Sequence, residues 1–215
     1  MPKPMKIDFV SDIACPWCAI GLSSLERTLA NAADVIDVDL TFQPFELNPD
    51  MPAGGQNVVE HLGEKYGTTP AQSAQNRQGL IARAQEVGFE MNMTDESRLY
   101  NTFDAHRLLH WAMLEGKQHA LKKALFAANF TQNRDVGDHS VLADAAQSAG
   151  LDRAAALEVL ESGRYSDEVR QAERLWQGRG ISAVPSIVIN EQYLISGGQP
   201  AETFEKALRQ IAAQS

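Results

Sequence analysis

The stretch "FVSDIACPWCAIG", residues 9–21, contains both cysteines of the 215-residue chain, Cys15 and Cys18. Two thiols three positions apart can belong to a metal clip, a structural disulfide or a redox pair. The sequence pattern changes at this motif, because the alternating run "KIDFVS" (6–11) precedes it and a helical apolar period follows from Pro16. The motif therefore lies where a predicted strand passes into a predicted helix.

Cys15 is expected at the N-cap of this helix, with Pro16 as the first helical residue, because proline's missing N–H and preset φ suit that position. The unpaired N–H groups and the positive end of the helix dipole then favour a thiolate on Cys15. Cys18 follows on the same face, about 5–6 Å away, a separation that a disulfide can span. This predicts that Cys15 attacks a substrate disulfide, and that Cys18 then displaces the product and closes the Cys15–Cys18 bond.

The other uses of a cysteine pair are less well supported by the sequence. A zinc site needs four ligands, or three and a water, and the suggestive histidines here are His106 and His110 in "AHRLLH". Such a pair more often packs or caps a helix, so we expect no metal. A disulfide of this spacing closes almost no loop and stabilises little. A pair of buried, inert cysteines is the remaining alternative to a redox pair.

Outward from the motif, the first 45 residues predict a strand, a helix and a second strand. The second strand (34–45) has period two, with Val38, Leu40 and Phe42 on one face. A loop rich in Pro and Gly follows it.

From residue 57 to about 179 the sequence shows helical stretches broken at glycines and no convincing strand. The strongest helical pattern covers residues 97–116. "SIVIN" and "YLIS" then predict two short strands, and residues 201–215 predict an amphipathic helix.

These patterns predict an α/β fold with a large all-helical insertion. Residues 1–45 and 180–215 are expected to build one mixed sheet with helices on it. Residues 46–179 are expected to form a helical insertion subdomain, because the segments that flank it are incomplete alone.

Pro185 opens the strand "SIVIN" directly after Val184. In this topology the loop before the third strand lies over the N-terminus of the first helix, so we expect a cis Val184–Pro185 bond beside the thiols. The backbone of Val184 would then pair with an extended substrate, and the proline ring would shield the thiols from metal. Val184 and Pro185, together with Pro16 and Trp17 between the cysteines, are the predicted substrate-binding residues.

Composition narrows the class of partner and the compartment. The net charge is -9 with no compensating basic stripe, so neither nucleic acid nor an anionic membrane is an expected partner. The start of the chain lacks the apolar run of a secretory signal, and an apolar run of about 18 residues occurs nowhere, so we expect a cytoplasmic protein without a transmembrane helix. In a reducing cytoplasm a CxxC pair is more often catalytic or metal-binding than a permanent staple.

The cysteine motif and the Val184–Pro185 segment belong to a series of four motifs that spans nearly the full chain. In order, these motifs are "SDIACPWCAIG", "FQPFELNPDMP", "DAHRLLHWA", and "GISAVPSIVIN" with "SGGQP" after it. Together they resemble the thioredoxin superfamily, in particular its DsbA-type branch and the FrnE-like group within it. The resemblance implies a thioredoxin-like βαβ…ββα fold with a DsbA-like helical insertion and a redox-active cysteine pair that needs no bound cofactor. It also implies that glutathione can be a co-substrate and that the chain can form a homodimer, although no sequence stripe indicates an interface.

Related 2-hydroxychromene-2-carboxylate isomerases and kappa-class glutathione transferases look similar overall but carry a serine where Cys15 stands. Cysteines at both positions therefore favour disulfide exchange with a protein or a low-molecular-weight thiol. A glutathione-dependent isomerase or transferase that uses Cys15 is the alternative enzyme, and the Val184 backbone and the loop 196–200 could hold glutathione in either case. A non-catalytic, polypeptide-binding module is the alternative outside enzymes.

The remaining residues of interest are interpreted mainly as structural. Trp17 is expected either to form a substrate platform or to pack under the insertion. The others are predicted as follows: Asp12 as a helix cap rather than a support of the Cys15 loop; Phe45, Leu47 and Asn48 as loop rather than active-site rim; Asn101 and His106 as satisfied polar residues; Trp111 and Trp176 as core.

Overall fold

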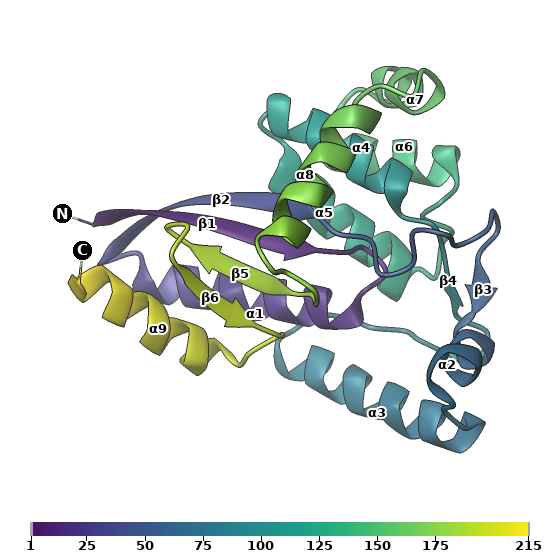
Figure 1. Cartoon of the computed structure of the whole chain (residues 1–215), viewed down its shortest axis with the longest axis horizontal. Helices are drawn as coiled ribbons and strands as arrows, with labels where there is room; N and C mark the ends of the chain where they lie inside the picture. Colours follow the sequence, from purple (N-terminus) through teal and green to yellow (C-terminus); the bar gives the residue numbers. More distant parts are fainter. Residues whose placement is uncertain (1, 215) are drawn as a thin grey trace.

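The computed structural model describes residues 2–214 (Figure 1). Four strands form the main sheet in the order β2-β1-β5-β6. β1 (Lys3–Ser11) and β2 (Ile36–Pro44) are parallel, while β5 (Ser186–Ile189) is antiparallel to β1 and to β6 (Tyr193–Ser196). The two ends of the chain thus build one mixed sheet, as the sequence patterns predicted.

Two helices cover one face of this sheet, α1 (Pro16–Ala32) and α9 (Ala201–Gln214), and they lie side by side (Figure 1). Apolar residues of α9 recur at helical spacing and are buried: Phe204, Leu208, Ile211 and Ala212. This completes the βαβ…ββα arrangement of a thioredoxin-like fold.

The chain between β2 and β5 is mostly helical, and its helices end near the predicted glycine breaks. Gly67, for example, follows α2 in the left-handed conformation with φ of 67°, a conformation that glycine adopts without strain. The helices are α2 (Val58–Tyr66), α3 (Pro70–Glu86), α4 (Phe103–Leu114), α5 (Gln118–Phe126) with its π-helical continuation η1 (Ala127–Thr131), α6 (His139–Ser148), α7 (Arg153–Glu161) and α8 (Ser166–Gly178).

The prediction that no strand occurs from residue 57 onward in this block was wrong. β3 (Gln56–Asn57) pairs antiparallel with β4 (Arg98–Leu99), and α4 begins only at Phe103. The Arg98 guanidinium donates hydrogen bonds to the carbonyls of residues 54 and 55. These long-range bonds, invisible to a local pattern, remove the first turns of the helix predicted over 97–116.

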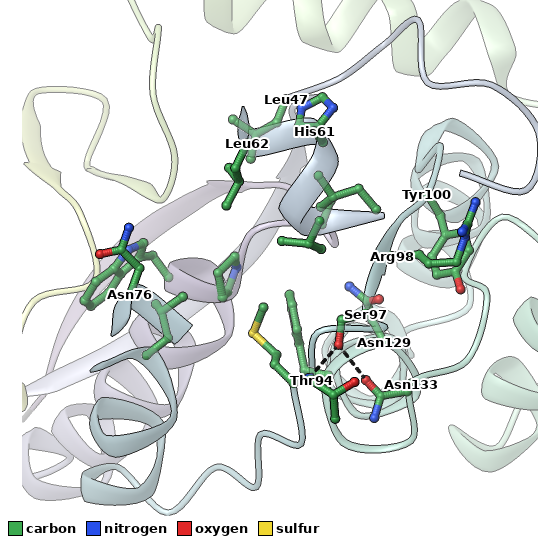
Figure 2. A pocket seen from close by; sticks show the side chains of 18 of the residues that line it. Leu47, His61, Leu62, Asn76, Thr94, Ser97, Arg98, Tyr100, Asn129 and Asn133 are labelled. Carbon is green, nitrogen blue, oxygen red and sulfur yellow. Dashed lines mark hydrogen bonds between the residues drawn. The ribbon is translucent and has the colours of Figure 1, made fainter. Parts of the chain in front are cut away.

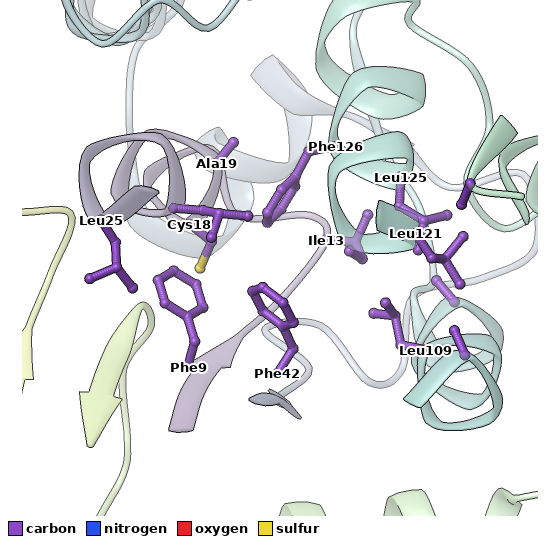
Figure 3. Packing of buried hydrophobic residues seen from close by; sticks show 14 of the residues in the cluster. Phe9, Ile13, Cys18, Ala19, Leu25, Phe42, Leu109, Leu121, Leu125 and Phe126 are labelled. Carbon is purple, nitrogen blue, oxygen red and sulfur yellow. The ribbon is translucent and has the colours of Figure 1, made fainter. Parts of the chain in front are cut away.

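Helices of the inserted block pack on the sheet and on α1. α4, α5 and α8 contact β2, and α3 contacts α1 (Figure 1). In the core, Phe9 and Phe42 meet edge to face at 5.8 Å, and Phe126 of α5 lies next to them (Figure 3). The insertion therefore closes the hydrophobic core around the cysteine motif. No helix within residues 2–214 has the length and apolar character to cross a membrane.

Candidate active site

Cys15 occupies the N-cap of α1, with φ -93° and ψ 111°, and Pro16 begins the helix, as predicted. The N–H of Cys18 donates to the carbonyl of Cys15 at 3.0 Å, so the two thiols start one turn apart on the same helix. Both cysteines are free thiols. Cys15 is 4% exposed and Cys18 is 0% exposed, which makes Cys15 the outer thiol of the pair.

The loop before β5 lies directly against Cys15. The Val184–Pro185 peptide bond is cis. The Cys15 thiol donates a hydrogen bond to the carbonyl oxygen of Val184, with 3.7 Å between sulfur and oxygen. The carbonyl of Pro185 in turn accepts from the N–H of Gly197 at 2.8 Å. The structure thus brings together the two segments that the sequence singled out, although they are almost 170 residues apart.

The loop between β6 and α9 supports the same site from the other side. A Cβ atom at Gly198 would lie 2.8 Å from the carbonyl oxygen of Trp17, closer than real Cβ contacts allow. Glycine is therefore required for the loop to pack on the first turn of α1. The segment 196–200 is accordingly both a strand exit and a wall of the cysteine site.

Cys18 points into the hydrophobic core (Figure 3), where it lies among the rings of Phe9, Phe42 and Phe126. Burial raises the pKa of the Cys18 thiol well above its ordinary value, and the neighbouring Cys15 raises it further. Cys18 is therefore a neutral thiol at physiological pH.

Asp12 does not cap a helix, so that prediction was wrong. Its carboxylate accepts from the N–H of Ala14 at 3.2 Å, from the N–H of Leu47 at 2.7 Å and from the hydroxyl of Thr102 at 2.7 Å. Burial opposes the charged form, but the hydrogen bond and charge of His106, with the Leu47 amide and the Thr102 hydroxyl, lower the pKa of Asp12 on balance. Asp12 ties the Cys15 loop to the loop after β2 and to α4.

Asn101, just before α4, and His106 of α4 form hydrogen bonds with backbone carbonyls and not with the thiols, as predicted. His106 donates from Nε2 to the carbonyl of Phe45 at 3.1 Å and lies 3.5 Å from Asp12. The side-chain amide of Asn101 donates to the carbonyls of Pro49 and Met51. His110 packs on the ring of Tyr165 instead, so the two histidines have separate partners. The predicted core tryptophans, Trp111 and Trp176, are buried.

A cleft of about 800 Å³ opens beside the motif (Figure 2). Ala14, Pro16 and Trp17 line one side, and residues of α2, α3, β4 and η1 line the rest. Trp17 is 41% exposed, so it forms a surface of the cleft rather than packing under the insertion. Leu47 and Asn48 also line the cleft, which corrects their interpretation as mere loop, whereas Phe45 is buried away from it.

Asn129 is a site residue that the sequence analysis missed. It lies in the π-helical continuation η1, its side-chain amide donates to the carbonyl of Ile13 at 3.0 Å, and it lines the cleft (Figure 2). π-Helical turns are frequent at functional sites because they re-aim side chains. The sequence contains no signal for the extra residue in this turn.

Lys122 of α5 was also missed. It is 0% exposed, and its Nζ makes no hydrogen bond within the described part of the chain. Burial lowers the pKa of Lys122 to about 8, against the opposing charges of Cys18, Asp12 and Cys15. A signal for it existed, because Lys122 interrupts an apolar stripe at helical spacing: Leu121, Leu125 and Phe126.

The comparison with known families agrees with this geometry. Residues 6–209 match the model of the DSBA-like thioredoxin domain. The chain belongs to the DsbA-like thioredoxin domain family. The DsbA-type fold that the motifs predicted is therefore confirmed, and members of this family are oxidoreductases and isomerases that act on thiols or disulfides.

Solved structures extend this DsbA-like assignment. A probable DsbA oxidoreductase from Streptomyces coelicolor is 36% identical, with a TM-score of 0.92 over 98% of this chain and 91% of that one. A 2-hydroxychromene-2-carboxylate isomerase is 16% identical, with a TM-score of 0.75 over 97% of both chains. The cytosolic disulfide reductase DsbM from Pseudomonas aeruginosa, solved with GSH, is 18% identical, with a TM-score of 0.61 over 95% of this chain and 99% of DsbM. The last two similarities concern the fold alone.

Proposed function

We propose that this DsbA-like chain is a thiol–disulfide oxidoreductase in which Cys15 is the nucleophile and Cys18 the resolving thiol. Cys15 attacks a substrate disulfide and forms a mixed disulfide, and the first product thiol leaves. Cys18 then attacks Cys15, the Cys15–Cys18 bond forms, and the second product thiol leaves. The reverse sequence oxidises a dithiol.

The observation that carries the proposal is the unequal placement of the two thiols. Cys15 lies at the helix N-terminus, against the backbone of Val184 and beside the cleft. Cys18 is enclosed in the core one turn deeper. The outer thiol adjoins Ala14 and Pro16, which line the cleft, whereas the inner thiol is fully enclosed. A two-step exchange needs this order, because the substrate must meet the first sulfur before the second.

The surroundings of Cys15 suit two kinds of substrate: a disulfide in an extended polypeptide, or a disulfide of a small thiol compound. The N–H of Val184 makes no hydrogen bond within residues 2–214, so it can donate to a substrate next to Cys15. Pro16, Trp17 and Pro185 complete the surface around that sulfur. The cleft volume lies in the range of small-molecule sites, which makes glutathione a reasonable co-substrate. DsbM, a relative in fold, was solved with GSH.

The proposal requires no bound cofactor, since the electrons reside in the cysteine pair. Action in the cytoplasm is part of it, because a glutathione pool would then supply or remove electrons. A homodimer remains compatible with it.

Equilibration of the protein against glutathione buffers, read by thiol alkylation and mass, tests the proposal. We expect a reversible two-electron transition between the dithiol and an intramolecular disulfide. A midpoint of about -270 mV would indicate a reductant and one of about -120 mV a strong oxidant. Stable glutathionylation of Cys15 without an intramolecular disulfide would contradict the dithiol mechanism.

The second candidate is a glutathione-dependent isomerase or transferase that uses Cys15 alone. The volume of the cleft and the fold shared with 2-hydroxychromene-2-carboxylate isomerase favour it. In that case the variant Cys18→Ala keeps full activity, whereas in the oxidoreductase it does not. A non-catalytic polypeptide-binding module would keep its function without either cysteine.

A further inference from the structure

Lys122 is a buried charge without an evident structural role. Its side chain is 0% exposed, and within the described residues its Nζ has no hydrogen-bond partner. An ammonium group that is buried without hydrogen bonds destabilises a fold relative to an apolar side chain of the same size. Neighbouring positions of α5 carry leucine and phenylalanine, which pack at no such cost.

Lys122 and Cys18 share the same aromatic surroundings. The Nζ lies 5.0 Å from the centre of the Phe126 ring and 5.9 Å from that of Phe42. Cys18 lies between the same two rings and Phe9 (Figure 3). The interaction is reciprocal, because the Cys18 charge raises the pKa of Lys122 and the Lys122 charge lowers the pKa of Cys18. Both side chains are 0% exposed, so the interaction is little screened by bulk solvent.

Lys122 also lines a separate cavity of about 160 Å³. His106, His110 and Gln118 line it together with Lys122, and it shares no lining residue with the cleft beside Trp17. The charged or titratable groups around Lys122 are Cys15 at the N-cap of α1, Cys18 of α1 and Asp12 of the loop before α1. The two histidines of α4, His106 and His110, line the same cavity.

We propose that Lys122 accepts the proton of the Cys18 thiol when Cys18 resolves the mixed disulfide, and returns that proton to solvent through this cavity. The inference rests on the proposed disulfide exchange. Neutral Lys122 becomes an ammonium as the Cys18 S–H bond breaks. The Cys18 sulfur bonds to the Cys15 sulfur, the bond from Cys15 to the substrate sulfur breaks, and the substrate leaves with that electron pair as a thiolate. Two protein thiols are oxidised and one substrate disulfide is reduced.

The timing follows from the charges around Lys122. A negative Cys15 favours the ammonium form of Lys122. The mixed disulfide has no charge on Cys15, so its formation increases the fraction of Lys122 that is neutral. Only the neutral amine can accept the Cys18 proton in the next step. A pKa of about 8 leaves part of the lysine neutral near pH 7, which exposed lysines do not offer. Substrate and proton thus use different sides of the motif.

Stopped-flow mixing of the reduced protein with excess 5,5′-dithiobis(2-nitrobenzoate) separates the two steps. The first release of thionitrobenzoate reports the attack by Cys15 and depends on reagent concentration, whereas the second reports resolution by Cys18 and does not. For Lys122→Met we expect an unchanged first phase and a second phase slower by about a hundredfold at pH 7. The deficit should shrink at high pH, where hydroxide deprotonates Cys18. Lys123→Met, at the exposed neighbour, should leave both phases unchanged.

A merely structural role predicts a different result. A change of both phases alike, or an equal second phase in Lys122→Met and the parent, would overturn the inference and leave the oxidoreductase proposal standing. A parent protein without a second phase would overturn both. As an equilibrium readout, thiolate absorbance at 240 nm in a Cys15→Ala background should show ionisation of Cys18 moving to higher pH when Lys122 is also replaced by Met. No movement would contradict the inference.

Discussion

Cys15 and Cys18 belong to the same helical turn, but they face different halves of the molecule. Cys15 lies against the Val184 backbone and the cleft, where a substrate can approach. Cys18 lies among aromatic rings that come from the sheet and from α5 of the insertion. The CxxC spacing therefore sets the distance between the thiols, whereas the surrounding elements give each thiol its chemistry.

The largest effect should come from removing each thiol in turn. Cys15→Ala should reduce disulfide exchange to the uncatalysed background, because the remaining thiol, Cys18, is 0% exposed. Cys18→Ala should still attack a substrate disulfide but should accumulate a stable mixed disulfide on Cys15. Alanine is preferable to serine at position 18 because a hydroxyl would be buried without a partner in this apolar environment. Mass analysis after reaction with a disulfide distinguishes the two variants, and identical behaviour would show that the thiols are equivalent.

The support of the Cys15 loop gives a second, smaller effect. Asp12→Asn keeps the shape of the side chain but turns one acceptor into a donor that faces the N–H of Leu47 or Ala14, so we expect the free energy of unfolding to fall by about 2 kcal/mol at pH 7. Denaturant titration measures it, and Asp50→Asn at an exposed position is the control.

This difference should also depend on pH. The pKa of Asp12 is lowered in the folded protein, so its contribution to stability is present above the ordinary carboxyl range and is lost as pH falls through the folded value. The gap between parent and Asp12→Asn should therefore close on acidification below about pH 4. A gap that stays constant from pH 7 down to strongly acidic conditions would show that the carboxylate charge is not what holds the loop.

The smallest predicted effect concerns the outer wall of the site. Gly198→Ala places a Cβ atom 2.8 Å from the Trp17 carbonyl, and backbone must shift to relieve the contact, so we expect a loss of about 1–2 kcal/mol in unfolding free energy. Gly178→Ala, in α8 with no atom within 4 Å of the added group, should instead stabilise by about 0.5 kcal/mol. Equal effects of both substitutions in thermal or denaturant unfolding would contradict the packing of this loop on α1.

The sequence pattern predicted correctly those features that depend on neighbouring residues alone. The N-cap position of Cys15 and the start of α1 at Pro16 follow from proline chemistry and helix geometry. The helix predicted over 97–116 begins later than expected, because the Arg98 side chain forms hydrogen bonds with a segment more than 40 residues away. Asp12 was misread for the same reason, since two of its donors, Leu47 and Thr102, come from distant parts of the chain.

Local sequence pattern predicted the paired thiols, the strand–helix junction that holds them and the order of most elements, because these features depend on residues close to one another along the chain. The DsbA-like class of fold was indicated instead by the resemblance of motifs that are spread over the chain. The folded structure was needed to show that Trp17 faces a cleft, that Asp12 ties three segments together and that Lys122 and Cys18 share buried aromatic surroundings. Burial and electrostatic coupling arise from residues brought together across the fold, so the reactivity of each thiol is a property of the folded chain.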